Sequence, residues 1–226
     1  MIQKKKFSDA IAANISVVEG LLPLKDIYDG VFIMFHRKSD DYPLCVKPDK
    51  WQSYQDSGEI ADGVLISEGG RNLVVAPTDA TLRWSSAAVS GGGTTTSDRL
   101  TALDDFNGKN NTASQITHTE CQGKNNAPGF CSLYSRTNAN GKGLTAGKWW
   151  LPSAGELMLM YSNIRRINHC LSLIAGATQL PEGTHWASTE FSSTDAWFLN
   201  FSYGSLFWCA KVSYQFRVRP VSAFIS

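Results

Sequence analysis

The sequence has almost no excess of charge, with 21 basic and 20 acidic residues among 226 and a net charge of +1. The short basic run 4–6 is typical of a solvated tail, so nothing electrostatic favours nucleic acid. No apolar run approaches the roughly 18–20 residues that a membrane span needs. Polar residues between 8 and 19 also interrupt any signal-peptide pattern. The visible sequence fits a virion component or a cytoplasmic protein, or a cell-surface protein if a leader was trimmed.

The chain also lacks the motifs of common catalytic and metal sites. It contains no GxSxG, P-loop or HExxH motif, and its four histidines are scattered. The five cysteines form no CxxC pair, which disfavours zinc. Cys121 and Cys131 lie ten residues apart, so they could pair in an oxidising compartment or remain free thiols in a reducing one. We expect no metal, no cofactor and no enzymatic activity.

What the chain does have is 42% hydrophobic and 11% aromatic residues, enough for a folded core. Apolar residues at helical spacing predict a short helix over 7–18, and the apolar run 30–35 predicts a buried strand. Two further strands, 63–66 and 72–76, are predicted to form a hairpin because two glycines fall between them. We expect 46–62 to contain only short strands.

The middle of the chain predicts helices separated by a long loop. Ser97 is placed to cap a helix that Gly108 ends, and residues 120–147 have the composition of a loop. Ser153 and Glu156 have the spacing of a capping box. An apolar stripe continues from there to Gly176, which predicts one helix of about five turns.

The C-terminal part, from Trp186 onward, predicts strands only. Three are expected, over 196–201, 205–214 and 216–221, with turns near Gly204 and Gln215. Because helices precede strands and do not alternate with them, the fold class is expected to be α+β.

Several motifs in a fixed order resemble those of a known bacterial and phage group. They lie at residues 61–64, 73–77, 82–85, 105–112, 149–157, 186–190 and 217–221. The group comprises the variable proteins of diversity-generating retroelements, whose C-type-lectin-like fold is related to that of formylglycine-generating enzymes. The helix and strand patterns before these motifs predict a small N-terminal segment over 1–60, which packs on the rest or mediates assembly. The resemblance implies a C-type-lectin-like ligand-binding domain over 61–226.

The resemblance also implies that a reverse transcriptase rewrites the gene at template adenines over about residues 186–224. Asparagine codons changed at their two adenines yield most residue types found in 194–216, whereas Trp208 and Gln215 require lysine codons. The ligand would be a protein or a cell-surface molecule of unknown identity. Oligomeric state stays open. The scaffold residues would be Trp186, Trp197, Arg217, Arg219 and Pro220.

The residues of this C-terminal segment agree with a binding surface. Large apolar side chains occur at both odd and even strand positions, whereas a half-buried strand alternates. Either both faces are buried or aromatic side chains are exposed, and exposed Tyr and Trp suit recognition. The leading anchors would be Trp208, Phe207 and Tyr214. The expected contacts are Thr194, Asp195, Phe198, Tyr203, Ser205, Leu206, Phe207, Trp208, Ala210, Val212, Ser213, Tyr214 and Phe216.

Three alternatives stand beside this interpretation. A formylglycine-generating enzyme needs a reactive cysteine pair in the C-terminal core, and only Cys209 lies there. Calcium-dependent sugar binding needs an oxygen-rich acidic motif, which the chain does not contain. A structural or adhesin module of a bacterial or phage surface assembly would bury the same aromatic residues against another domain or subunit. Exposed aromatic residues favour display over this last alternative.

Overall fold

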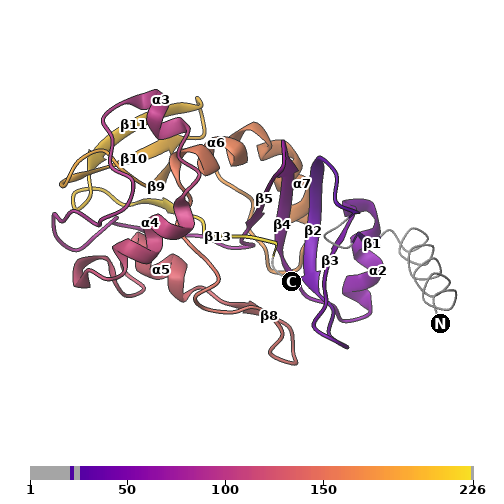
Figure 1. The fold of residues 1–226 in the computed structure, drawn as a ribbon. Helices are drawn as coiled ribbons and strands as arrows, with labels where there is room; N and C mark the ends of the chain where they lie inside the picture. Colours follow the sequence, from indigo (N-terminus) through magenta and orange to yellow (C-terminus); the bar gives the residue numbers. More distant parts are fainter. Residues whose placement is uncertain (1–20, 23–25, 225–226) are drawn as a thin grey trace, which may run out of the picture.

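The computed structural model describes residues 21–22 and 26–224, so the helix predicted over 7–18 lies outside the described residues. The described chain is a mixed α+β fold, as expected. It has two larger sheets, and helices pack against both of them. Figure 1 shows the strands formed by residues 30–46 at one end of the molecule and those formed by residues 195–210 at the other.

The first sheet has six strands, in the order β1-β3-β2-β4-β5-β13. Its strands are β1 (Leu21–Leu22), β2 (Gly30–His36), β3 (Pro43–Val46), β4 (Ala61–Glu68), β5 (Arg71–Val75) and β13 (Val221–Ser222). The predicted hairpin is confirmed as β4–β5, and Gly69 and Gly70 in its turn take φ values of 58° and 78°. β2 pairs antiparallel with β4, so this sheet crosses the boundary predicted at residue 60.

The second sheet has five strands, in the order β11-β10-β9-β12-β6. Its strands are β6 (Ala80–Leu82), β9 (Thr184–Glu190), β10 (Asp195–Asn200), β11 (Ser205–Ala210) and β12 (Phe216–Val218). The turn predicted near Gly204 joins β10 to β11, but β11 ends at Ala210, four residues earlier than expected. A small pair, β7 (Arg136–Thr137) and β8 (Gly143–Leu144), lies apart from both sheets.

The helices are short. They are η2 (Pro48–Lys50), α2 (Trp51–Asp56), α3 (Arg99–Leu103), α4 (Gly108–Gln115), η3 (Thr119–Cys121), α5 (Ala127–Leu133), α6 (Ala154–Ser162) and α7 (Ile164–Leu173). Two expectations were wrong. Residues 46–62 contain α2, whose Trp51 is buried against Phe35, and residues 120–147 contain α5, which has a proline in its first turn.

The helix predicted after Ser97 is shorter than expected. Asp98 caps α3 by accepting the backbone N–H of Thr101, and the helix ends before Phe106. Gly108 begins α4 and does not end α3. A Cβ at Gly108 would lie 2.1 Å from a carboxylate oxygen of Glu156, so close packing accounts for this glycine.

The long helix predicted from Ser153 is two helices. Its start is confirmed, because Ser153 and Glu156 form both hydrogen bonds of the capping box. At Asn163 the backbone leaves the helical region, with φ −108° and ψ 10°, and α7 begins at the next residue. The Asn163 amide donates to Glu68 in the β4–β5 hairpin and to the Leu159 carbonyl, so a distant partner holds the break.

Three buried clusters hold the elements together. The largest lies between the first sheet, α6, α7 and the β10–β11 hairpin, and includes Trp197 and Leu206. A second covers the other face of the first sheet, and a third surrounds Trp84 and Trp186 on the other face of the second sheet. Both Cys121 and Cys131 lie in the third cluster as free thiols, so the disulfide alternative does not hold in this structure.

Candidate recognition surface

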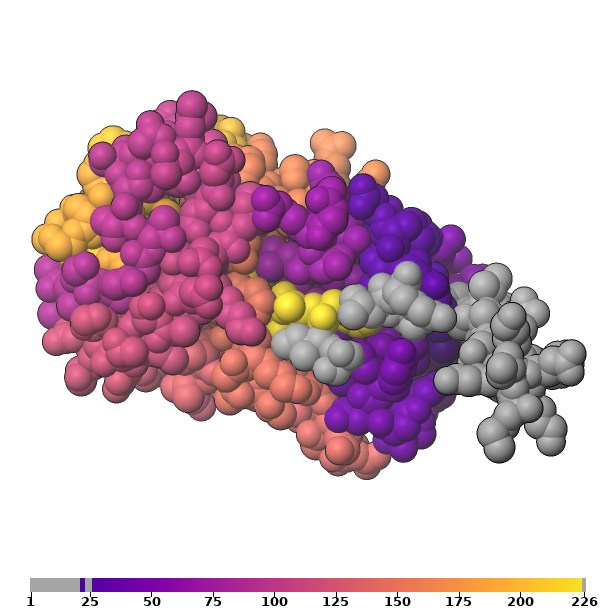
Figure 2. Space-filling model, in the orientation of Figure 1, coloured from indigo at the N-terminus to yellow at the C-terminus, as the bar shows by residue number. Residues whose placement is uncertain are grey.

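The β10–β11 hairpin carries most of the predicted contact residues. Its register pairs Trp197 with Trp208 and Phe198 with Phe207. Cross-strand partners point to the same face of a sheet, so the two Trp residues share one face and the two Phe residues share the other. The hairpin belongs to the late strands at one end of the molecule, away from β2 and β3 at the other (Figures 1 and 2).

Large apolar side chains are exposed on both sides of this hairpin. The exposed fractions are 79% for Tyr203, 53% for Tyr214, 47% for Phe207 and 44% for Trp208. Of the nine large apolar residues exposed in the described chain, five lie between 203 and 214. Such a concentration in twelve residues is unlike the scattered exposure of an ordinary surface.

Ring contacts support the exposed aromatic side chains from beneath. On one face, the Trp208 ring stacks on Phe191 at 4.3 Å and meets the buried Trp197 edge-on at 5.5 Å. On the other face, Phe198 lies 4.8 Å from Phe216, whose ring in turn stacks on Tyr214 at 5.7 Å. These contacts restrict the rings before any ligand arrives, which lowers the entropy cost of binding.

The predicted contact residues divide by exposure. Those exposed are Thr194, Tyr203, Phe207, Trp208, Val212, Ser213 and Tyr214. Those partly exposed are Asp195, Phe198, Ser205, Ala210 and Phe216. Leu206 is corrected: it is 4% exposed and packs in the largest cluster, because its strand position faces the core near the turn. It supports the surface and cannot contact a ligand.

The predicted scaffold residues are mostly buried. Trp186, Trp197, Arg219 and Pro220 have almost no exposed surface. The Arg219 guanidinium donates to the carbonyls of Ala76 and Gln179. Arg217 differs, since it is exposed and lies 3.3 Å from Asp79.

Sequence reasoning missed two residues of the surface. Phe191 stacks on Trp208, and the Arg99 guanidinium lies 5.6 Å from the centre of the Phe207 ring. Phe191 precedes the first predicted contact by only three positions, so its aromatic character was a usable signal. Arg99 comes from α3, more than 100 residues away in sequence, and no local pattern could place it.

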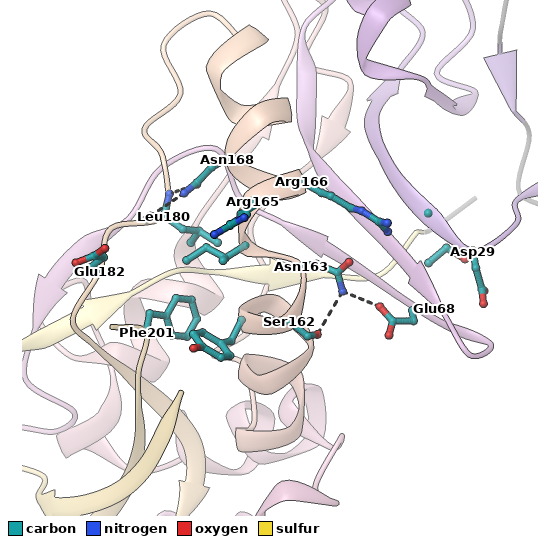
Figure 3. Close-up of a pocket in the computed structure, with 14 residues that line it drawn as sticks. Asp29, Glu68, Ser162, Asn163, Arg165, Arg166, Asn168, Leu180, Glu182 and Phe201 are labelled. Carbon is teal, nitrogen blue, oxygen red and sulfur yellow. Dashed lines mark hydrogen bonds between the residues drawn. The ribbon is translucent and has the colours of Figure 1, made fainter. Parts of the chain in front are cut away.

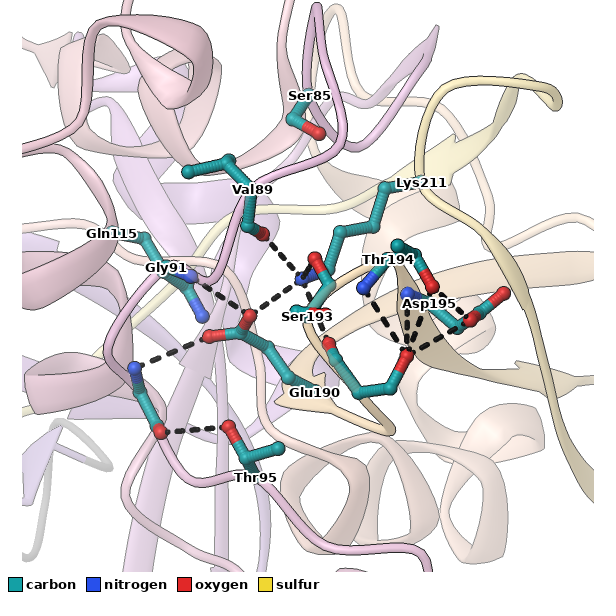
Figure 4. Close-up of polar contacts among 12 residues, drawn as sticks. Ser85, Val89, Gly91, Thr95, Gln115, Glu190, Ser193, Thr194, Asp195 and Lys211 are labelled. Carbon is teal, nitrogen blue, oxygen red and sulfur yellow. Dashed lines mark hydrogen bonds and ion pairs between the residues drawn. The ribbon is translucent and has the colours of Figure 1, made fainter.

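Sequence reasoning also missed a buried ion pair beneath the surface. The Lys211 ammonium lies 2.5 Å from a carboxylate oxygen of Glu190, and both side chains are fully buried. The ammonium also donates to the carbonyls of Val89, Ser192 and Ser193 and lies 4.6 Å from the centre of the Trp84 ring. Figure 4 shows the hydrogen bonds and the ion pair converging on the ammonium.

Glu190 connects the pair to a glycine-rich loop. Its carboxylate accepts the backbone N–H groups of Gly91 and Gly93, at 2.9 and 3.2 Å. Three segments therefore meet at one buried charge pair: this loop, the β9–β10 turn and the residues after β11. Lys211 is the only charged residue from 196 to 216, so that stretch exposes no charge.

A cleft with a volume of about 900 Å³ lies elsewhere. It opens at the break between α6 and α7, where Arg165 and Arg166 project from the first turn of α7, and Glu68 and Asp29 lie across from them (Figure 3). Its lining is polar and of mixed charge. Phe201, which precedes β11, contributes to its wall, but none of the predicted contact residues does.

Two buried titratable groups elsewhere have strongly shifted pKa values. Burial raises the pKa of Glu156 to about 7, against hydrogen bonds from Ser153 and Trp150 that favour the carboxylate. Burial lowers the pKa of His185 to about 3. Both groups lie in the core and not in a cleft, so they bear on stability.

A second buried pair joins His36 Nδ1 and a carboxylate oxygen of Asp62 at 2.6 Å. Burial raises the pKa of Asp62 although His36 opposes the shift. Both residues are almost without exposed surface, so a substrate has no access to them. Among residues 21–22 and 26–224, no cluster of three His, Cys, Asp or Glu side chains could hold a metal. No helix in this described part is long and apolar enough to cross a bilayer.

Comparisons with known proteins identify no family. No protein-family model matches the sequence, and no curated protein matches it. Among solved structures, a fimbrial protein from Bacteroides ovatus is similar over 67% of this chain, with 18% sequence identity and a TM-score of 0.47. The match spans 35% of that protein's chain. This likeness is too low to assign a fold family or a function.

Proposed function

We propose that this protein recognises a protein or cell-surface ligand through the surface around β10 and β11, and that its fold is a C-type-lectin-like scaffold. The recognition surface consists of the twelve predicted contact residues that are exposed or partly exposed, together with Phe191 and Arg99. The scaffold assignment rests on the order of the sequence motifs. The mixed α+β architecture, with β9, β10, β11 and β12 in one sheet, is compatible with it.

The observation that carries the proposal is the exposure of aromatic side chains along residues 196–216, a stretch that exposes no charged side chain. Tyr203, Phe207, Trp208 and Tyr214 are each more than 40% exposed, and no charged side chain is exposed from 196 to 216. Aromatic anchors surrounded by neutral polar groups are typical of the centre of a protein interface. Hydroxyl groups of Ser205 and Ser213 supply adaptable hydrogen bonds at its edge.

We further propose that the gene segment for this surface is diversified by a retroelement. Diversification is restricted to exposed positions, because only these tolerate varied side chains without loss of the fold. Tyr203, Phe207 and Trp208 meet this condition. Leu206 and Lys211 do not, since one fills the core and the other neutralises a buried carboxylate.

Sequencing the DNA that flanks the gene tests the proposal. We expect a near-copy of the segment encoding residues 186–224, differing only at adenines, with a reverse-transcriptase gene nearby. Asparagine codons are expected in the copy at Phe207 and Tyr203, and lysine codons at Trp208 and Gln215. The codons of Leu206 and Lys211 are expected to be identical in both. Absence of such a copy would remove diversification and favour the structural or adhesin module.

A further inference from the structure

The strand β11 forms an open edge of the second sheet. In the order β11-β10-β9-β12-β6 it is terminal, and it pairs only with β10 among the described strands. An edge strand presents backbone N–H and C=O groups that another extended chain can pair with. Figure 1 shows β11 among the late strands at the end of the molecule.

The register identifies which groups of β11 point outward. The Lys211 N–H donates to the Thr194 carbonyl, so this pair is hydrogen-bonded across the ladder. Hydrogen-bonded pairs alternate along an antiparallel ladder. Residues 205, 207 and 209 therefore bond to β10, and residues 206, 208 and 210 direct their backbone groups away from it. The bond from the Phe201 N–H to the Gly183 carbonyl, on the far side of β10, fits the same alternation.

The free part of the edge centres on Trp208. Leu206 is buried, and the Ala210 carbonyl accepts the Ser213 N–H. At the two ends of β11, the Leu206 backbone and the Ala210 carbonyl are therefore not available to another chain. The Trp208 N–H, the Trp208 carbonyl and the Ala210 N–H remain, and no described residue forms a hydrogen bond with them. Three such groups in a row suit a short extended segment.

This edge carries none of the features that usually prevent strand pairing. Residues 205–210, SLFWCA, include no lysine, no proline and no charged residue, and the pairing with β10 runs without a bulge. Exposed aromatic rings flank the edge on both sides, Trp208 on one and Phe207 on the other. An added strand would therefore place alternate side chains against each ring.

We propose that the ligand binds by adding an extended segment to β11, with backbone hydrogen bonds to Trp208 and Ala210. This inference rests on the proposed recognition function and specifies its mode. The segment has apolar side chains at successive positions, because β11 itself bears no charge and has an aromatic ring on each face. Backbone pairing also lets the flanking side chains change while the binding mode stays constant.

Backbone substitution at Ala210 tests the proposal. Ala210→Pro removes an N–H that points outward, so pairing with β10 is preserved, whereas Ala210→Ser keeps this N–H. The probe is a library of linear peptides displayed on phage and selected against the full chain, keeping peptides whose binding Trp208→Ala abolishes. We expect Ala210→Pro to weaken these peptides at least about tenfold and Ala210→Ser to leave them within about twofold.

Amide hydrogen exchange gives a second readout that does not depend on the proline variant folding. In the free protein the Trp208 and Ala210 amides should exchange quickly and those of residues 207 and 209 slowly. A selected peptide should slow the first two. Peptides that bind Ala210→Pro as tightly as wild type and leave these amides fast would overturn strand addition but leave recognition standing. Failure to select any Trp208-dependent peptide would overturn both.

Discussion

The indole of Trp208 lies flat on the ring of Phe191, with centroids 4.3 Å apart and an angle of 3° between the planes. One face of the indole is thus covered by the protein, while 44% of the residue stays exposed. The contact fixes a large apolar group at the surface, where it gives no benefit to the core that a smaller residue could not. Under the proposed function, the remaining face of the indole is available to a ligand.

Trp208→Ala is therefore expected to reduce binding and not stability. The affinity of a Trp208-dependent peptide should fall by about 2 kcal/mol or more, as for an anchor at the centre of an interface. The midpoint of thermal unfolding should change by only a few degrees. Titration calorimetry and a thermal melt on the same sample measure both. A large drop in the melting temperature with unchanged affinity would make Trp208 a core residue.

Alanine variants of Leu206 and Tyr203 compare a buried residue that supports the recognition surface with an exposed residue that belongs to it. Leu206→Ala leaves a cavity in the largest cluster, so the free energy of unfolding should fall by about 2–5 kcal/mol. Tyr203→Ala removes a side chain that is 79% exposed, and the change should stay within about 0.5 kcal/mol. Urea denaturation of the two variants provides the measurement. Equal losses would contradict the assignment.

Local patterns in the sequence predicted those elements whose causes are local. The capping box at Ser153 needs only Glu156 three residues later, and the β4–β5 turn needs only Gly69 and Gly70. The break at Asn163 could not be predicted in this way, because its partner Glu68 is 95 residues distant. The apolar stripe continued through the break and concealed it.

The candidate surface was predicted in part for a related reason. Apolar residues at both odd and even positions indicated that the strand 205–210 does not bury one face only. Its position at a sheet edge explains how large apolar side chains on both of its faces are exposed. The sequence could not separate Leu206 from Trp208, which point to the same face. Distance from the core decides between them. No local pattern in the sequence indicated the buried ion pair of Lys211, since its partners are residues 89, 190, 192 and 193.

The buried ion pair of Lys211 and Glu190 predicts how the free energy of unfolding changes when one or both of its charges are removed. Lys211→Met leaves the Glu190 carboxylate buried without its cation, and this should cost about 3–5 kcal/mol of the free energy of unfolding. Adding Glu190→Gln should restore part of this loss, because the amide carries no charge. Chemical denaturation of the single and double variants gives the coupling. Strictly additive losses would mean that the ion pair has no role of its own.

Glu156 predicts a specific pH dependence of stability. Its folded pKa of about 7 lies above the ordinary value of 4.5, so the folded state holds a proton that the unfolded state releases between these values. Its contribution is thus fully present below pH 4.5 and is lost as the pH rises through 7, by up to about 3 kcal/mol. His185 has the opposite effect. Because its folded pKa is about 3, its contribution to the free energy of unfolding is lost as the pH falls from 6.5.

The two effects are separated by comparing Glu156→Gln with wild type at each pH. Glutamine is neutral throughout, so the difference in unfolding free energy should move in favour of the variant as the pH rises from 4.5 to 7, and then stay level. His185 is present in both proteins and cancels. Urea denaturation at pH 4.5, 5.5, 6.5 and 7.5 is sufficient for this test. A difference that does not change with pH would mean that Glu156 is ionised in the folded core, held by the Ser153 and Trp150 donors.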